Sequence, residues 1–123
     1  MLQPADLERR KPVWIALSTL WLDTELQEEV LRSIADVLRA SGYSAETLYE
    51  VYLYEVAPAV YTNLLSPAGV WAGFDAEWLC AEVERHARRR SATRERMLRL
   101  KKGVMTYATE DAWKRLMQLW AAP

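Results

Sequence analysis

The chain has 123 residues, a length that allows a hydrophobic core to form without disulfides or metals. Hydrophobic residues make up 51% of it, which excludes a globally disordered protein. The single cysteine, Cys80, excludes an internal disulfide and fits a reducing compartment. We therefore expect one folded domain over residues 1–123.

The net charge of −1 averages two regions of opposite sign. Residues 1–84 carry 14 acidic and 5 basic side chains, which gives −9. Residues 85–102 form a basic segment with 9 basic side chains and one acid, Glu95, which gives +8. Such an asymmetry informs about binding partners and not about the fold.

The N-terminal part predicts a loose lead-in over residues 1–11, followed by a first helix. Pro12 suits the first turn of a helix, because its missing N–H is not needed there. Apolar residues at helical spacing follow it. We expect this helix to run from about Pro12 to Leu22.

A second helix is predicted from about Glu25 to Ala40, with Asp23 and Thr24 as candidate caps. Acidic residues in its first turn interact favourably with the positive end of the helix dipole. Gly42 is placed to end it in a left-handed turn.

The most apolar stretch, residues 48–75, contains the predicted centre of the fold. Ser44 is a good cap for a third helix from Ala45 to about Val56, which is apolar nearly all the way round and therefore expected to be buried. A strand is the alternative, since Val and Tyr favour strands, but strict alternation fails at residues 51–54.

Proline and glycine mark the end of this stretch. Pro58 predicts an end or a kink of the third helix, followed by a short helix from Ala59 to Leu65. Residues 66–69 predict a turn, and Trp71 and Phe74 a loop that folds back over the core.

The C-terminal third predicts further helices. Asp75 is a good cap for a helix that either continues into the basic segment or restarts after Ser91. Gly103 is expected to end that segment. Thr109 is a candidate cap for a last helix over residues 110–120.

These elements predict an all-α protein, a compact single-domain bundle of five to six helices around a central apolar helix. The apolar run at residues 51–65 is too short and too interrupted for a membrane span. No signal peptide is visible, so we expect a cytoplasmic protein.

Glu50 and Glu55 are the only candidates for acid–base catalysis, since two carboxylates in an apolar setting can have raised pKa values. Five helical residues place them about 140° apart, so they do not share a face. We expect each to accept hydrogen bonds from a Tyr, an Arg or a loop amide, and we predict no catalytic residues.

Cys80 and His86 do not form a reactive or metal-binding pair. A zinc site needs about four ligands, and a Cys and a His six positions apart face different sides of a helix. The sequence therefore predicts no metal and no cofactor.

Three sets of residues are candidates for binding a partner. An acidic surface comprises Glu25, Glu28, Glu29, Asp36 and Glu46. Arg88, Arg89 and Arg90 are the centre of the basic segment. Trp113 and Trp120 of the last helix are candidate contact residues, because Trp is enriched at interface hot spots.

The stretches RRKPVWIALSTLWLDTEL and YEVAPAVYTNLLSPAGVWAGFDAEWL resemble a group of small bacterial proteins of unknown function. The resemblance covers residues 9–79 and implies a small cytoplasmic helical protein without known catalytic residues. Small proteins of this sort are often immunity proteins encoded beside secreted toxins.

We therefore expect a non-enzymatic protein-binding module, most concretely an immunity protein that neutralises a bacterial toxin. The alternative is a nucleic-acid-binding or regulatory protein that uses residues 85–102. An enzyme built on Glu50 and Glu55 is a third hypothesis. The sequence does not fix the oligomeric state.

Overall fold

The computed structural model describes residues 3–22, 26–61 and 75–122. Within these ranges the regular structure is entirely helical, as predicted. The elements in chain order are α1 (Pro4–Ser18), η1 (Thr19–Trp21), α2 (Glu28–Ser41), α3 (Ala45–Glu50), η2 (Val51–Val56), α4 (Ala57–Val60), α5 (Ala76–Arg88), α6 (Ala92–Leu100), α7 (Lys102–Thr106) and α8 (Glu110–Ala121).

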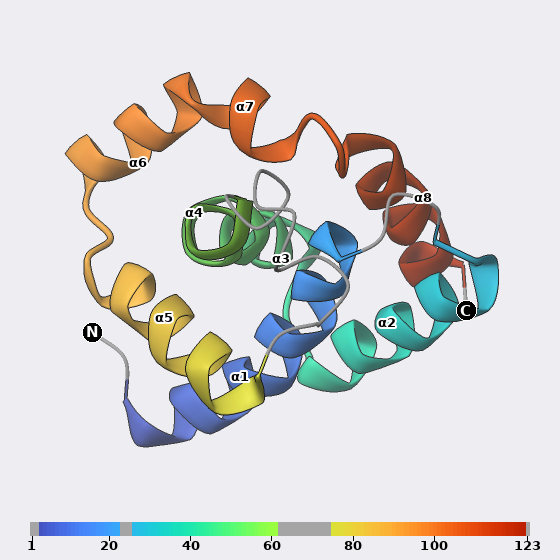
Figure 1. Cartoon of the computed structure of the whole chain (residues 1–123). Coiled ribbons are helices and arrows are strands. Elements are labelled where there is room, and N and C mark those ends of the chain that lie inside the picture. Colours follow the sequence, from blue (N-terminus) through green and yellow to red (C-terminus); the bar gives the residue numbers. More distant parts are fainter. Residues whose placement is uncertain (1–2, 23–25, 62–74, 123) are drawn as a thin grey trace.

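The elements α3, η2 and α4 follow one another without a break and form one central helix. In Figure 1 this helix is seen almost end-on, and the other helices surround it. Every side chain from Val51 to Ala57 is buried, which agrees with the predicted central apolar helix. With the central helix counted once, the described part of the chain has seven helices and not five to six. The basic segment adds to the number because it ends one helix, forms a second and begins a third.

The central helix continues through Pro58, so the prediction that it ends there is wrong. A proline ring clashes with the carbonyl four residues back, here that of Tyr54, if the preceding turn is a regular α-helix. The residues before the proline, Val51–Val56, form a π-helix instead. Its wider turn bonds each N–H to the carbonyl five residues back and leaves room for the ring. The short helix predicted at residues 59–65 is the end of the same helix as far as Tyr61, and its remainder lies outside the described residues.

Helix α1 begins at Pro4 and not at Pro12, so the predicted lead-in at residues 4–11 is helical. Pro4 supplies the preset backbone angle that we expected from Pro12. Pro12 lies on the exposed side of α1, where water can reach the carbonyl that loses its partner. Contacts with distant residues hold the early turns in place, among them the hydrogen bond from Arg9 Nε to the carbonyl of Ser41 at 2.7 Å.

Several predicted helix ends are confirmed. The hydroxyl of Ser44 accepts from the amide of Thr47, and Asp75 caps α5 in the same way. Ser91 caps α6, so the helix restarts there and does not run on from α5. The predicted caps at residues 23 and 24 and the predicted turn and loop at residues 66–74 lie outside the described residues.

Two predictions for the last third of the chain change. Gly103 does not end a helix but lies inside α7. Thr109 precedes α8 as predicted, but its side chain makes no capping bond. Its hydroxyl lies 2.7 Å from the hydroxyl of Tyr52 and donates to the carbonyl of Thr106, so it is used by the core.

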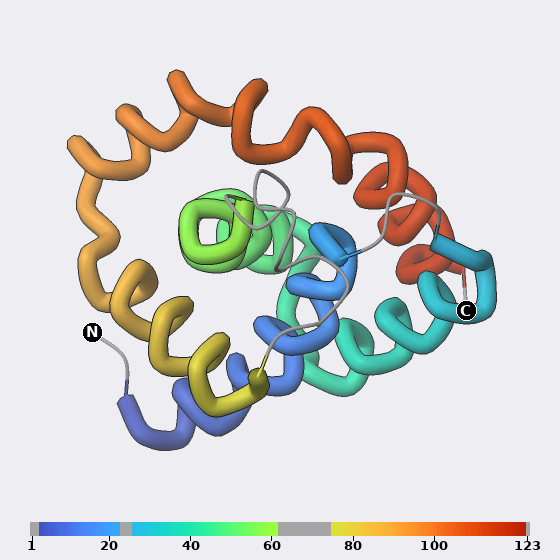
Figure 2. Tube along the Cα trace, in the orientation of Figure 1, coloured from blue at the N-terminus to red at the C-terminus, as the bar shows by residue number. Residues whose placement is uncertain are grey.

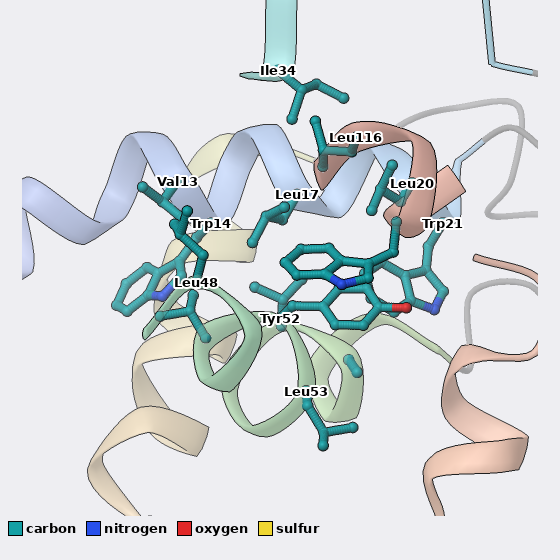
Figure 3. Packing of buried hydrophobic residues seen from close by; sticks show 14 of the residues in the cluster. Val13, Trp14, Leu17, Leu20, Trp21, Ile34, Leu48, Tyr52, Leu53 and Leu116 are labelled. Atoms are coloured by element: carbon teal, nitrogen blue, oxygen red, sulfur yellow. The ribbon is translucent and has the colours of Figure 1, made fainter. Parts of the chain in front are cut away.

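Aromatic rings join the central helix to its neighbours. The ring of Tyr52 stacks on Trp113 of α8 at 4.3 Å and lies 5.3 Å from Trp21 of η1. The indole N–H of Trp21 donates to the carbonyl of Met105 at 2.9 Å, which fastens η1 to α7. Burial raises the pKa of Tyr52 to about 12, so the hydroxyl stays neutral. Figure 3 shows Trp14 and Leu17 of α1 facing the central helix in the same core.

The trace in Figure 2 shows α2 beside α8, although the two helices are far apart in the sequence. Arg39 of α2 donates to the carbonyls of Leu119 and Trp120 at 3.0 and 3.2 Å. These carbonyls belong to the last turn of α8, which has no helical partners for them. The guanidinium therefore caps the C-terminal end of α8 and ties it to α2.

Substitution of the two glycines among the described residues by alanine should change the free energy of unfolding in opposite directions. Gly42 has a φ of +77°, a conformation that costs other residues about 1–2 kcal/mol. We therefore expect Gly42→Ala to lower the free energy of unfolding by about 1 kcal/mol or more. Gly103 lies in α7, and a methyl group added there would meet no heavy atom within 4 Å, so Gly103→Ala should raise it by about 0.5–1 kcal/mol.

Urea unfolding of the two variants measures both effects under the same conditions. Equal destabilisation by both substitutions would contradict this description of Gly42 and Gly103.

Candidate functional site

A carboxylate is buried in the middle of the central helix. The Glu55 side chain is only 2% exposed, although ionised carboxylates normally remain in water. It accepts hydrogen bonds from Arg10 Nη1 at 2.8 Å, from the indole of Trp14 at 2.9 Å and from Arg90 Nη1 at 2.7 Å. Arg10 and Trp14 lie on α1, and Arg90 lies between α5 and α6. Glu55 therefore joins three parts of the chain, and its bonds offset the cost of removing its charge from water.

Arg90 binds three carboxylates at once. Its Nη1 donates to Glu55, its Nη2 to Glu50 at 2.8 Å and its Nε to Glu95 at 2.8 Å. Its guanidinium carbon also lies 5.3 Å from the centre of the Tyr54 ring. Burial disfavours the charge, but the hydrogen bonds to Glu50, Glu95 and Glu55 outweigh it and raise the pKa of Arg90. Arg90 is thus a fixed cation inside the fold.

We refer to these groups as the Glu55 cluster, which consists of Arg10, Trp14, Glu50, Glu55, Arg90 and Glu95. The cluster changes one prediction, because Glu50 and Glu55 reach the same guanidinium and do not face different sides. The predicted angle of about 140° between Glu50 and Glu55 around the helix axis assumes a regular α-helix. Residues five apart lie closer to one face in a π-helix, whose hydrogen bonds span five residues. The expectation that each acid accepts hydrogen bonds from an arginine is confirmed.

An open groove of about 610 Å³ lies beside the cluster, and it is bounded by α3 and η2 of the central helix, by α6 and by α8. We call it the carboxylate groove. The residues that give it its chemistry are three acids, Glu46, Glu50 and Glu95, and three aromatic residues, Tyr49, Tyr54 and Trp113. Arg99 and Met117 also line it.

Of the three acids that line the carboxylate groove, two are paired with an arginine and one is not. Glu50 and Glu95 are each bonded to Arg90, and Arg99 donates to the Tyr54 hydroxyl at 2.9 Å. Glu46 is exposed at the rim and makes no ion pair with any described residue. The rim therefore carries one carboxylate that is free to bind a cation.

The aromatic side chains of the carboxylate groove already bind cations within the fold. The Nζ of Lys102 lies 5.4 Å from the centre of the Tyr49 ring, and Tyr49 lies 5.8 Å from Trp113. Hydrogen bonding to Tyr49 raises the pKa of Lys102. Together with Arg90 above Tyr54, this contact shows that the ring faces are oriented to attract positive charge. The arrangement can bind a cation, and it offers no nucleophile paired with a base.

The predicted acidic residues do not form one surface. Only Glu46 lines the carboxylate groove. Glu29 is exposed on α2, and Asp36 forms an ion pair with Arg39 on the same helix. Glu25 lies outside the described residues.

Glu28, the remaining acid of that set, is already bound. It accepts from Arg115 of α8 at 2.7 and 2.9 Å and from Arg32 at 3.1 Å. The bonds to Arg115 and then to Arg32 lower its pKa. Glu28 therefore links α2 to α8 and is not free for a partner.

The predicted basic residues are also divided. Arg88 pairs with Glu84 one turn earlier at 2.7 Å, and Arg90 belongs to the Glu55 cluster. Only Arg89 is exposed without an ion pair to a described residue. The three arginines therefore do not present a common surface.

The two tryptophans of α8 are core residues to different degrees. Trp113 is 8% exposed and stacks on Tyr52, and it also lines the carboxylate groove. Trp120 is half-buried against the core, and its indole N–H has no hydrogen-bond partner among the described residues. Their role as partner-contact residues stays a prediction.

Cys80 and His86 lie on α5 in separate surroundings. Cys80 is half-buried, and burial raises the pKa of its thiol. His86 Nδ1 lies 2.6 Å from Arg94 Nη2, and burial followed by the charge of Arg94 lowers the pKa of His86. The described residues contain no group of three or more metal-binding side chains. No helix among them is long and apolar enough to cross a membrane.

Sequence analysis missed most of the carboxylate groove. Tyr49, Tyr54, Glu95, Arg99 and Met117 come from three helices that are far apart in the sequence. Periodicity reveals which face of one helix is apolar, but not which helices meet. The one available signal was the run of tyrosines and acids at residues 49–55.

The buried carboxylate leads to a prediction for stability. Glu55→Gln keeps the size of the side chain but removes the charge that Arg10 and Arg90 face, so it should lower the free energy of unfolding by about 3 kcal/mol. Glu50→Gln is the matched control, because Glu50 binds the same Arg90 but is 51% exposed, and it should cost less than about 1 kcal/mol. Chemical denaturation of both variants at neutral pH measures the difference, and equal effects would contradict the assigned role of Glu55.

Comparison with known families gives one match. The model of a family described as a domain of unknown function (DUF7079) matches residues 8–119, which includes the Glu55 cluster and the carboxylate groove. No curated protein and no solved structure matches the chain. The match covers most of the chain, and the chain therefore belongs to the DUF7079 family, a domain of unknown function.

Proposed function

We propose that the chain is a non-enzymatic protein-binding module, and that the carboxylate groove receives a lysine or arginine side chain of its partner. The observation that carries the proposal is the free carboxylate of Glu46 beside three aromatic residues and two further acids. A carboxylate attracts the charge of a cation, and a ring face binds it when water is removed.

The contacts within the fold support this choice of ligand. Arg90 lies above Tyr54 between Glu50 and Glu95, and Lys102 lies above Tyr49. Arg90 thus contacts a ring and two carboxylates, and Lys102 contacts a ring. A cation of the partner would contact groups of the same two kinds. A groove of about 610 Å³ has room for one long cationic side chain and part of its backbone.

The most concrete form of this proposal is an immunity protein that works in the cytoplasm. It would neutralise a bacterial toxin by covering a basic surface that the toxin needs for its activity. The net charge of −9 over residues 1–84 supports it, because long-range attraction speeds the encounter with a basic partner. The groove then supplies the local contact.

The alternative is a nucleic-acid-binding protein that uses the basic segment. Several arginines of that segment are already engaged, including Arg85 with Glu82, Arg88 with Glu84 and Arg90 within its cluster. Each ion pair reduces the charge that is available to neutralise phosphates. The structure therefore favours the protein-binding proposal.

The proposal requires that a gene for a secreted toxin lies beside the gene for this chain, and it is tested with the product of that gene. Cells that express the toxin should survive when they also express the chain, and the purified proteins should form a complex. Glu46→Arg should weaken that complex at least tenfold, which is about 1.4 kcal/mol. Glu29→Arg makes the same change on exposed α2 and should weaken it no more than about threefold, through long-range charge alone.

Absence of a complex with that toxin, or equal effects of the two substitutions, would contradict the proposal. Salt-dependent binding to duplex DNA that is lost in Arg89→Glu would favour the alternative. Arg89 is the suitable residue for that control because Arg90 is needed for the fold.

A further inference from the structure

One arginine of the basic segment has a histidine as its side-chain partner instead of an acid. Arg94 of α6 is half-buried, and its Nη2 lies 2.6 Å from Nδ1 of His86 on α5. Its Nε is buried without a hydrogen-bond partner, and Arg94 forms no ion pair with any other described residue. A guanidinium that is partly withdrawn from water normally binds a carboxylate. The position of Arg94 therefore depends on His86.

This contact requires a neutral imidazole. A guanidinium has five N–H donors and no acceptor, so Nδ1 of His86 must accept the hydrogen bond and the ring proton must be on Nε2. Protonation of the ring adds a hydrogen to Nδ1, which then faces another donor. The hydrogen bond is lost, and two positive charges lie in contact. The side chains of His86 and Arg94 must then separate.

The charges near His86 on its own helix do not compensate for this repulsion. Arg85 and Arg89 add positive charge, and Glu82, which favours the protonated ring, is itself bonded to Arg85 at 2.8 Å. The last turn of α5 attracts a cation through the helix dipole, but this attraction is small beside a guanidinium in contact. Burial and then the charge of Arg94 lower the pKa of His86.

The other helices that pack on α5 place their charges elsewhere. Helix α1 brings Glu8 and Lys11 near Cys80, earlier on α5. Glu55 of the central helix and Glu95 of α6 are both bound by the arginine at the centre of the Glu55 cluster. The short element α4 has no charged side chain. The contact across the α5–α6 turn is therefore the main charge contact of the histidine.

The contact spans the turn at which α6 begins. In Figure 1, α6 follows α5 around the central helix. Arg94 lies in the first turn of α6, where its amide donates to the capping hydroxyl of Ser91. Because α6 supplies Glu95 and Arg99 to the carboxylate groove, the way in which its first turn is held affects the shape of the groove.

We propose that the contact between His86 and Arg94 is an acid-sensitive joint, which holds the first turn of α6 against α5 while the imidazole is neutral and releases it when the imidazole is protonated. The joint acts on the groove whatever the groove binds, so it does not depend on the proposed function. The unfolded chain binds the proton more readily than the folded chain. The contribution of the joint to stability is therefore present above about pH 6.5 and is lost as the pH falls below it.

His86 is the only histidine of the chain, so NMR titration of the imidazole resonances follows its protonation directly. We expect the ring to titrate at a lower pH than a histidine in an unstructured peptide. Arg94→Met removes the charge but keeps an unbranched side chain, and it should move the titration toward the peptide value. Arg96→Met makes the same change at an exposed position of α6 and should leave the titration unchanged.

Hydrogen exchange of the amides measures the release of α6 itself. Protection factors, corrected for the intrinsic pH dependence of exchange, should fall at least about fivefold in α6 between about pH 7 and pH 5, and less than about twofold in α8. His86→Asn places an amide oxygen near the position of Nδ1, which accepts from Arg94 and does not titrate. Its protection in α6 should be the same at both pH values. The carboxylates of the Glu55 cluster are present in both proteins, so the comparison isolates the histidine.

Either of two results would overturn the proposal. The first is an imidazole that titrates at or above the peptide value, or whose titration Arg94→Met leaves unchanged. The second is the absence of a loss of protection in α6 at acidic pH, or a loss of equal size in His86→Asn, which would assign the effect to the carboxylates.

Discussion

The buried carboxylate of Glu55 is the constraint on which the rest of the structure depends. An ionised acid can remain in a core only if hydrogen bonds and opposite charge replace the water that it loses. Arg10 and Trp14 must therefore come from α1, and Arg90 from the α5–α6 turn, to reach the same two oxygens. The cluster specifies where these helices lie around the central helix more sharply than apolar contacts can, because apolar contacts have little direction.

The geometry of the central helix determines what the cluster can reach. The π-helical turn at Val51–Val56 accommodates Pro58 and brings Glu50 and Glu55 to one guanidinium. Arg90 in turn binds Glu95, which places α6 along the edge of the carboxylate groove. The carboxylate groove thus depends on the position of this helix.

The features that could be predicted from the sequence are those encoded by neighbouring residues. Ser44 and Asp75 were identified as caps, and Gly42 as a left-handed end, because a cap is decided within one turn. The apolar circumference of residues 48–56 likewise predicted a buried helix. The predicted end of the helix at Pro58 was wrong because the rule assumes an α-helix, and the π-helical turn that tolerates the ring is set by the packing around it. The carboxylate groove could not be predicted, since it exists only where three distant helices meet.

The most direct test of the central claim is a double-mutant cycle between Glu55 and Arg90, with Glu55→Gln, Arg90→Met and the double variant compared with the unaltered chain by chemical denaturation. If the buried carboxylate and this guanidinium stabilise each other, the two losses will not add, and the coupling energy will be about 2 kcal/mol. Losses that add to within about 0.3 kcal/mol would contradict the account, because the two side chains would then stabilise the fold independently of each other.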